Sequence, residues 1–434
     1  MSVKVLIHSG PPPPSAEWRR YDHVVGLQPT VLPAQVHHNL GLLGTGSHPL
    51  PENVLTLLVV SLGVWVADKL APRQQAADAW TRRLEVFCPA PEWAEALPGL
   101  SQVLDFLTGD TWILRASPMP AWLPMVLRPD PSWQPDCVCL FSGGLDSLVG
   151  AIDLLEAGQR LLLVSHYDFG QLAGCQNYLT AALRQAYGPD RVRHWGFRLQ
   201  FEAPELSLRS RSLLFIALGA AAASVWDAPR TVVIPENGWI SLNPPLTGNR
   251  LGSYSTRTTH PYFLSSFQAW LATVGLAINL ENPYHYQTKG ELLSHCRNQS
   301  LLRQLAPHTL SCAHPMASRW RKGRQGNCGY CYPCLIRRAA LHAVGWDDGR
   351  DYLVDVLRQP EILTSRGRGA DLRSLLYLLR AWEAHPNPHR LLWQTGPLPG
   401  QSCQQYVTLL RHSLAEIHGW WQDKPTADAC QDRG

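Results

Sequence analysis

The sequence lacks a hydrophobic run long enough to span a membrane. Its longest apolar segment, near residues 55–67, falls short of the roughly 20 residues that a transmembrane helix needs, so we expect a buried strand or a core helix there. The start of the chain also lacks the basic segment and apolar stretch of a signal peptide. Both absences lead us to expect a cytoplasmic protein with no membrane part.

An excess of charge of one sign is missing too. The 38 Lys and Arg residues nearly balance the 34 Asp and Glu residues, which leaves a net charge of +4. This excess is too small to indicate nucleic-acid binding by bulk electrostatics. The composition, with 45% apolar and 17% charged residues, excludes a disordered or fibrous chain. The 434 residues suffice for about two to three domains at roughly 150 residues each.

The order of apolar segments divides the chain into three parts. Residues 1–125 hold proline-rich loops and strand-like segments at 84–87 and 112–114, which predict a mixed α/β accessory domain. After a proline-rich linker, residues 132–345 alternate strands with helices, the pattern of an α/β domain with a parallel sheet. Residues 346–434 predict a helical extension. The middle strands are expected at 137–141, 161–164, 191–195 and 231–234, and the C-terminal helices at 351–357, 372–382 and 406–421.

A glycine-rich turn between the first of these strands and an amphipathic helix is the most informative motif. Its residues are Ser142, Gly143, Gly144, Leu145, Asp146 and Ser147. Two glycines let the backbone approach a ligand closely, and the free N–H groups at the following helix start attract anions. Asp146 would repel a phosphate unless it holds Mg²⁺ or caps the loop. The pattern is neither a Walker loop nor a dinucleotide fingerprint, and a turn that uses Gly and Ser only for its geometry is the alternative.

Three cysteines, Cys328, Cys331 and Cys334, recur at a spacing that lets neighbouring thiols converge on one ion. Cys312 is the expected fourth ligand, with His314 as the alternative. Four thiolates favour a closed, structural Zn²⁺ site, and an iron–sulfur cluster is the rival interpretation. The total of eleven cysteines is odd, and with no export signal in the sequence it favours metal binding over disulfides.

Taken together, the loop and the cluster resemble known proteins. The loop resembles the pyrophosphate loop of the ATP pyrophosphatase (PP-loop) superfamily, whose HUP-like domain binds ATP. With the cysteines, residues 137–343 look like QueC, the 7-cyano-7-deazaguanine synthase family. Residues 168–171 are similar to that family's Asp-Tyr-Gly-Gln, residues 288–292 resemble its Thr-Lys-x-Glu-Ile segment, and Arg337 follows the cluster as its pattern requires.

The departures from QueC point to a more specific resemblance. Residues 1–125 and 346–434 have no counterpart in the housekeeping enzyme, and the spacing between Cys312 and Cys328 is longer. The longer architecture resembles the QatC proteins, QueC-like components of the Qat anti-phage defence systems, with relatives in cyclic-oligonucleotide defence operons as the nearest alternative. This resemblance implies an ATP-dependent, C–N bond-forming ligase or synthetase. It would adenylate a 7-deazaguanine carboxylate, release pyrophosphate, and pass the acyl group to ammonia or to an amine of a protein partner from the same operon.

Other functions stay open. They are the housekeeping synthase of queuosine biosynthesis, an adenylating tRNA-modification enzyme, and a scaffold that keeps only the fold. An RNA-binding role would need a basic surface, for which the cluster at Arg319, Arg321, Lys322 and Arg324 is the concentrated candidate. Binding of nucleic acid is therefore left undecided.

The expected ligands are ATP, Mg²⁺, Zn²⁺ and a small 7-deazapurine substrate, and the following residues are the candidates that would contact them. Asp146 and Lys289 are the catalytic candidates, with Lys289 stabilising charge on the α-phosphate. Ser142 to Ser147, His166, Arg209 and Arg211 are the ATP-binding candidates, because the arginines start a helix and His166 ends a strand. The substrate-binding candidates are Glu236, Asn237, Arg257 and His260, and the metal ligands are Cys312, Cys328, Cys331 and Cys334.

Overall fold

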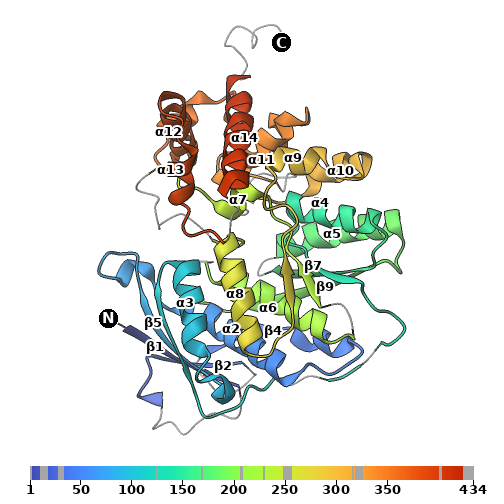
Figure 1. The fold of residues 1–434 in the computed structure, drawn as a ribbon, viewed down its shortest axis with the longest axis vertical. Coiled ribbons are helices and arrows are strands. Elements are labelled where there is room, and N and C mark those ends of the chain that lie inside the picture. Colours follow the sequence, from blue (N-terminus) through green and yellow to red (C-terminus); the bar gives the residue numbers. More distant parts are fainter. Residues whose placement is uncertain are drawn as a thin grey trace.

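The computed structural model consists of two sheets, whose strands are mostly parallel, and a group of C-terminal helices (Figure 1). The structure describes residues 2–9, 18–27, 34–123, 126–128, 130–167, 170–205, 209–227, 230–247, 257–314, 317, 326–399 and 403–423. Four members of the predicted basic cluster, Arg319, Arg321, Lys322 and Arg324, lie outside the described residues, as do Asp168 and Phe169.

The first sheet belongs to the N-terminal part and is entirely parallel. Its strand order is β3-β2-β1-β5-β6. The strands are β1 (Ser2–His8), β2 (His23–Gly26), β3 (Ala34–Gln35), β5 (Arg83–Cys88) and β6 (Thr111–Ala116). The alternating burial of β5 explains why its residues 84–87 were predicted as a strand. The N-terminal part is therefore an α/β unit in which α3 (Leu97–Thr108) leads from β5 to β6.

The longest apolar segment forms helix α2 (Glu52–Leu70), so the expectation of a core helix holds. By composition alone the helix could cross a membrane, but 78% of its most apolar window is buried inside the protein. Gly63 lets it approach strand β1, since a Cβ at this position would lie 2.7 Å from Cγ1 of Ile7. Helix α2 also packs against α6 (Arg211–Ser224) of the second unit. These contacts are those of a helix buried in the core.

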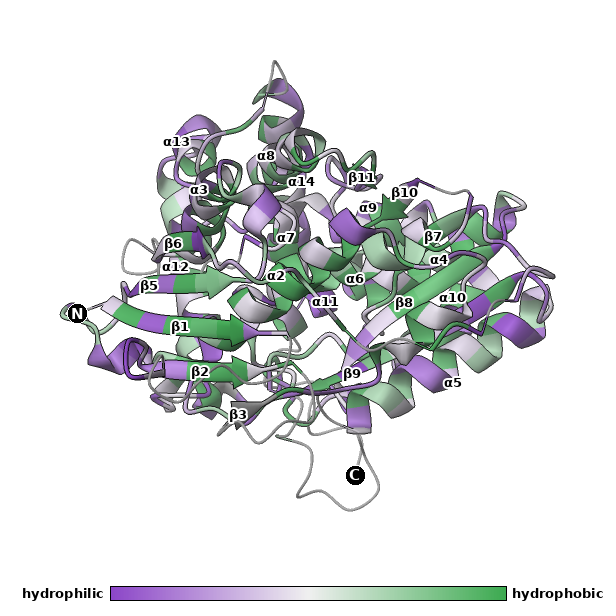
Figure 2. Cartoon of the chain, turned by 90° about the horizontal axis from the view of Figure 1, so that it is seen from below, coloured by the Kyte–Doolittle hydropathy of each residue, from purple (hydrophilic) through white to green (hydrophobic). Residues whose placement is uncertain are grey.

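The second sheet has the order β11-β10-β7-β8-β9-β4. The strands are β7 (Cys137–Leu140), β8 (Leu161–Tyr167), β9 (Val192–Gln200), β10 (Thr231–Val233), β11 (Asn279–Glu281) and β4 (His37–His38). All neighbours are parallel except β4, which pairs antiparallel with β9. Strands β7 and β8 are coloured as hydrophobic over most of their length in Figure 2, as expected for strands covered on both faces.

The order of the five parallel strands determines where a ligand can bind. Starting from β7, the sheet adds β8 and then β9 on one side of this strand. It adds β10 and then β11 on the other side. Open parallel sheets bind ligands at the carboxyl ends of the strands where this reversal occurs, here between β7 and β10. Helices α4 (Leu145–Glu156), α5 (Gly170–Tyr187), α6 and α8 (Pro261–Thr273) belong to this unit. The four strands predicted in this part of the sequence are present, while β11, with three residues, gave no pattern to detect.

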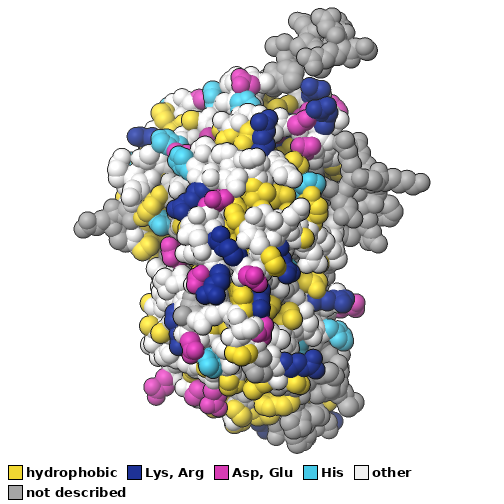
Figure 3. Space-filling view, turned by 90° about the vertical axis from the view of Figure 1, so that its right-hand side faces the viewer, with side chains coloured by type: hydrophobic (Ala, Val, Ile, Leu, Met, Phe, Trp, Pro, Cys, Tyr) yellow, Lys and Arg dark blue, Asp and Glu magenta, His cyan; other side chains and the backbone are white. Residues whose placement is uncertain are grey.

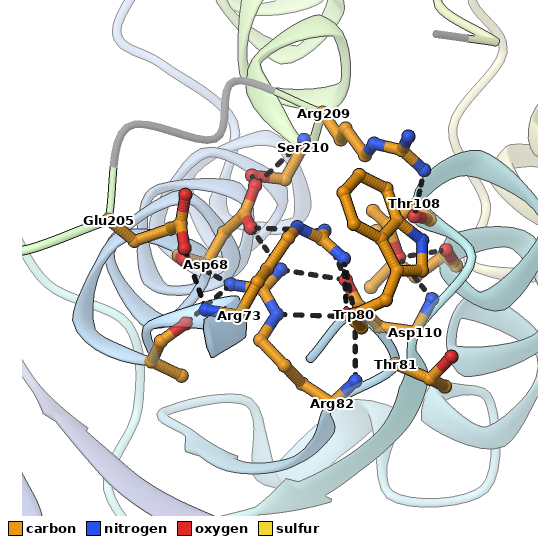
Figure 4. A network of polar contacts seen from close by, with 12 residues as sticks. Asp68, Arg73, Trp80, Thr81, Arg82, Thr108, Asp110, Glu205, Arg209 and Ser210 are labelled. Atoms are coloured by element: carbon orange, nitrogen blue, oxygen red, sulfur yellow. Dashed lines mark hydrogen bonds and ion pairs between the residues drawn. The ribbon is translucent and has the colours of Figure 1, made fainter. Parts of the chain in front are cut away.

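A buried network of charges joins the two units (Figure 4). Asp68 at the end of α2 accepts hydrogen bonds from Arg82 and from the hydroxyl and backbone N–H of Ser210. Asp110, which precedes β6, binds the guanidinium groups of Arg73 and Arg82. Because Ser210 precedes helix α6, this network fixes the start of α6 against the N-terminal unit.

Helices of the C-terminal part form a third core around Trp239, Tyr406 and Trp420. The helices beyond residue 237 are α7 (Gly238–Leu242), α8, α9 (Lys289–Ser294), α10 (Gln299–Leu305), α11 (Tyr332–Ala343), α12 (Ala370–Ala384), α13 (Pro388–Trp393) and α14 (Cys403–Gln422). Short 3-10 helices occur at Leu40–Thr45, Arg73–Gln75, Pro91–Trp93, Ala306–His308, Gly349–Asp351 and Pro360–Thr364. The helices predicted at 372–382 and 406–421 correspond to α12 and α14.

The helix predicted at 351–357 is absent from the described structure, and this prediction was wrong. The segment instead pairs its backbone with the cysteine loop. Leu353 N–H donates to the Asn327 carbonyl at 3.0 Å, and Val354 N–H donates to the Cys328 carbonyl at 3.1 Å. These bonds replace the hydrogen bonds that a helix would make with itself.

Candidate functional site

The glycine-rich turn lies at the carboxyl end of β7, where the strand order reverses, and leads into α4. Gly143 adopts a φ of 83°, a conformation that favours glycine. The Ser142 hydroxyl accepts a hydrogen bond from Gly144 N–H at 3.2 Å and lies 3.2 Å from the Ser147 hydroxyl. The turn is therefore held by its own serines, with the first turn of a twelve-residue helix directly behind it.

Asp146 is buried at the start of α4 and is surrounded by donors. One carboxylate oxygen forms an ion pair with Lys289 Nζ. The other accepts from the backbone N–H of Asn237 at 3.1 Å and from its side-chain amide at 2.6 Å. Burial alone would raise the pKa of Asp146, but Lys289 and hydrogen bonds from Glu236 and Asn237 lower it to about 2. The carboxylate is therefore ionised at neutral pH.

Glu236 lies beside Asp146 and is the second carboxyl of the site. Burial raises the pKa of Glu236 well above its usual range, and the neighbouring Asp146 charge raises it further. Both effects favour the protonated form of Glu236 beside the negative charge of Asp146. Strand β10 ends only three residues before Glu236, so the strand delivers this side chain to the ligand edge of the sheet.

A cavity of about 380 Å³ opens over these groups. The turn forms one side, and Glu236, Lys289 and Arg211 contribute the polar side chains. Its lining also includes Leu310, Ser311, Cys312, Ala313, Pro333 and Ile336. Residues of the cysteine cluster and next to it therefore line the same cavity as the glycine-rich turn.

A second cavity of about 280 Å³ adjoins the first. Both are lined by Ser142, Arg211, Pro235 and Glu236. The second cavity is mainly apolar, with Leu140, Phe215, Ile216 and Ile234 in its wall and Thr258 and Thr259 as polar additions. An apolar space beside a charged one suits a ligand that joins a flat heterocycle to an anionic group.

The four predicted cysteines come together. The sulfur atoms of Cys312, Cys328, Cys331 and Cys334 all lie within 4.8 Å of one another. Cys312 and Cys331 are 3.9 Å apart, as are Cys328 and Cys334. Four thiolates at the ~2.3 Å bond length of a tetrahedral Zn²⁺ site would lie about 3.8 Å apart. The group could therefore hold a metal ion such as zinc.

Backbone geometry supports a closed metal site. N–H groups of Ala313, His314, Cys328 and Cys331 point at cysteine sulfurs at 3.3–3.4 Å, an arrangement that stabilises thiolates. Gly329 has a φ of 84°, and a Cβ there would lie 2.1 Å from the carbonyl oxygen of Val354. In an iron–sulfur cluster of four irons, each thiolate binds a different iron, so the sulfurs lie farther apart than around one ion.

The segment that carries Cys312 is hydrogen-bonded to the glycine-rich turn. Leu310 N–H donates to the Gly143 carbonyl at 2.9 Å, and Leu145 N–H donates to the Ser311 hydroxyl at 3.3 Å. Ser311 N–H in turn donates to Asn327, the neighbour of Cys328, at 2.9 Å. Ser311 thus contacts both parts of the site. The sequence analysis missed it because a serine beside a cysteine has no distinctive pattern.

The remaining predicted residues divide between the cavity and other places. Arg211 lines both cavities and donates from Nε to His166 Nδ1 at 3.2 Å. His166 is buried, and burial with the nearby Arg211 charge lowers its pKa well below the usual range, so it is a neutral partner of Arg211. Arg209 points elsewhere: it donates to the Thr108 carbonyl at 2.7 Å and lies over the Trp80 ring (Figure 4).

Three predicted substrate-binding residues are engaged within the protein. Asn237 uses its amide for Asp146 and its carbonyl oxygen to cap α7, accepting from Ile240 N–H at 3.1 Å. Arg257 donates to the Phe106 carbonyl at 2.8 Å. His260 caps α8, and burial lowers its pKa to about 3. A contact with a purine would compete with these bonds, whereas Glu236 faces the cavity directly.

Comparison of the chain with protein-family models, with curated proteins and with solved structures finds no match. The interpretation of the site therefore depends on its own geometry.

Proposed function

We propose that the protein is a PP-loop enzyme that activates a carboxylic acid with ATP. The observation that carries the proposal is the arrangement of Asp146 and Lys289 beneath a Gly-Gly turn, at the reversal of the strand order and within one cavity. The turn's N–H groups and the start of α4 suit the pyrophosphate part of ATP. Lys289 supplies the positive charge that stabilises the α-phosphate as it is attacked.

The reaction we propose has two steps. An oxygen of the substrate carboxylate attacks the α-phosphorus of ATP, which forms an acyl adenylate and releases pyrophosphate. A nitrogen nucleophile then attacks the acyl carbon, AMP leaves with the electron pair of the broken C–O bond, and the nitrogen releases one proton to solvent as the amide forms. Arg211 lines both cavities and is placed to hold the adenylate phosphate between the charged and the apolar parts of the site.

The residues present fit a divalent cation. Asp146 is ionised and lines the cavity at the glycine-rich turn. We propose that Asp146 holds Mg²⁺, which would neutralise charge on the leaving pyrophosphate, and that Glu236 is left for the substrate. At the cysteines, we propose structural Zn²⁺, because the four thiolates form a closed group that shares its loop with the cavity wall.

The resemblance to QueC and to the QatC proteins supports a 7-deazaguanine carboxylate as the acid and anti-phage defence as the setting. The apolar second cavity has room for such a heterocycle, with Glu236 as an acceptor for its ring N–H groups. The acceptor nitrogen would come from ammonia or from an amine of a partner protein. Figure 3 shows Lys, Arg, Asp and Glu interspersed over the described part of one face, and RNA modification stays the alternative proposal.

Mass spectrometry with purified components tests this proposal. The protein is incubated with ATP, Mg²⁺ and the 7-deazaguanine carboxylate, with and without proteins from its operon. Pyrophosphate release that Asp146→Ala abolishes is expected, and a mass gain on a partner equal to the acyl group would identify a protein acceptor. Free nitrile product would instead indicate the housekeeping synthase. No pyrophosphate release under any of these conditions would refute the proposal.

A further inference from the structure

Helix α14, in the C-terminal part of the chain, contacts the segment that carries Lys289. Glu416 of α14 is half-buried and lies at the start of α9. One of its carboxylate oxygens accepts from Gly290 N–H at 3.2 Å, and the other accepts from the Thr288 hydroxyl. These two donors flank Lys289 in the sequence. A residue 127 positions away therefore contacts both neighbours of the lysine that pairs with Asp146, the backbone of Gly290 and the side chain of Thr288.

The local sequence does not need this contact to start the helix. Thr288 and Glu291 already form a complete capping box, in which Glu291 N–H donates to the Thr288 hydroxyl at 3.0 Å and Thr288 N–H donates to Glu291 at 2.8 Å. The Thr288 hydroxyl uses its own proton for Glu416. The contact with Glu416 is therefore not needed for α9 to form. It determines the position of α9 relative to α14.

Gly290 is the residue that permits the contact. A Cβ at this position would lie 2.5 Å from Oε1 of Glu416 and 3.1 Å from Cβ of Ala343 in α11. Gly290 does not have a positive φ, so the backbone conformation does not require glycine here. The close approach of Glu416 does, which makes Gly290 and Glu416 a matched pair.

We propose that Glu416 is a positioning residue that, through Thr288 and Gly290, holds Lys289 against Asp146, so that the C-terminal helices control the geometry of the phosphate site. A lysine side chain has four rotatable carbons, and its ammonium is placed accurately only where its backbone is fixed. The consequence for catalysis depends on the proposed function. The effect on Lys289 itself does not.

Acetylation of Lys289 tests the positioning directly. The full-length protein is treated with sulfosuccinimidyl acetate, and the rate of modification of Lys289 is followed by peptide mass spectrometry. The wild-type lysine is buried and paired, so it should react slowly. In Glu416→Ala and Gly290→Ala the reaction should be about tenfold faster, the size expected when one contact of a coupled network is removed.

His412→Ala is the matched control. His412 lies one turn earlier on α14 and also contacts α9, at 2.7 Å from Glu291, but this pair is exposed to solvent. The rate for His412→Ala should stay within about twofold of the wild type, as expected for a screened surface pair. Glu416→Gln keeps the size of the side chain and provides a further variant if Glu416→Ala does not fold. An unchanged Lys289 rate in a folded Glu416 variant would overturn the proposal.

ATP–pyrophosphate exchange, measured with the 7-deazaguanine carboxylate, supplies the catalytic readout. Glu416→Ala should lower kcat with little change in the KM for ATP. The double variant Glu416→Ala/Lys289→Ala should have the same kcat as Lys289→Ala alone, because both substitutions remove the same contribution of Lys289. Additive losses would indicate a structural role and count against positioning. Absence of exchange in the wild type would refute the proposed function, whereas the acetylation rates would still decide the role of Glu416.

Discussion

Replacing Arg82 by Met should destabilise the protein more than other arginine substitutions, because Arg82 is the centre of the buried charge network (Figure 4). Its guanidinium group donates to Asp110 at 2.7 and 3.2 Å, to the side chain of Asp68, and to the carbonyls of Asp68 and Ala71 at 2.7 and 2.8 Å. The side chains of both aspartates are fully buried. The substitution would therefore leave Asp68 with Arg73 only at 4.0 Å and Asp110 with Arg73 as its single arginine partner.

Removing one partner of a buried ion pair typically costs about 3–5 kcal/mol, and each abandoned acceptor adds to the cost. Arg73 still binds Asp110 in a bidentate manner, and Ser210 still donates to Asp68, so we expect about 4 kcal/mol rather than the sum of all losses. For a chain of this size, that loss lowers the melting temperature by about 4 °C.

Urea unfolding followed by tryptophan fluorescence, together with a calorimetric melt, measures this effect. Arg115→Met is the matched control, since its pair with Glu85 is largely exposed on the arginine side and should be worth less than about 1 kcal/mol. Combining Arg82→Met with Asp68→Asn should recover part of the lost unfolding free energy, because the poorly compensated negative charge of Asp68 is the main cause of the loss. Equal stability of Arg82→Met and Arg115→Met would refute the reasoning.

Three further outcomes follow from the site. Cys331→Ser should lower the metal content of the protein, measured by elemental analysis. It should also weaken binding of a non-hydrolysable ATP analogue about tenfold, because the contacts between the cysteine loop and the glycine-rich turn loosen. The control Cys403→Ser should change neither quantity. Asp146→Asn should lower pyrophosphate exchange by about 10²-fold or more in a folded protein, and retention of half the activity would contradict its role. Burial raises the pKa of Glu416 to about 7, although hydrogen bonds from Thr288 and Gly290 oppose the shift and the Glu291 charge adds to it. The folded state then binds the extra proton between about pH 4.5 and 7, so stability relative to Glu416→Gln should be highest below this window and fall by about 3 kcal/mol as pH rises through it. A difference in unfolding free energy that does not vary with pH would contradict this pKa.

The parts of the site that the sequence predicts are those built from neighbouring residues. The glycine-rich turn and the three close cysteines are each encoded within seven residues, and both adopt the geometry that their spacing indicates. Cys312 required a choice among scattered cysteines, and the structure places it with the other three. Repeated apolar strands likewise predict the parallel sheet, because strands buried on both faces are apolar throughout.

Side-chain direction could not be predicted in the same way. Arg209 and Arg211 stand on either side of Ser210 and look equivalent in the sequence. In the structure, Ser210 binds Asp68, Arg209 turns to the Thr108 carbonyl, and Arg211 faces the cavities. This division depends on the packing of the N-terminal unit against α6, which is a contact between distant segments. The error at 351–357 has the same origin, since a tertiary backbone pairing replaced a local helix.

The cavity is bounded by segments that are held in place from outside the second sheet. The wall around Ser311 depends on the cysteine loop, and the start of α6, with Arg211, depends on the buried charges of the N-terminal unit. Lys289 depends on α14 through Gly290. Ser311, Arg211 and Lys289 are therefore each positioned by a different part of the chain. Since a misplacement of about 1 Å in a catalytic group can cost 10²-fold in rate, we expect the terminal regions to influence the proposed reaction without contributing a reacting atom.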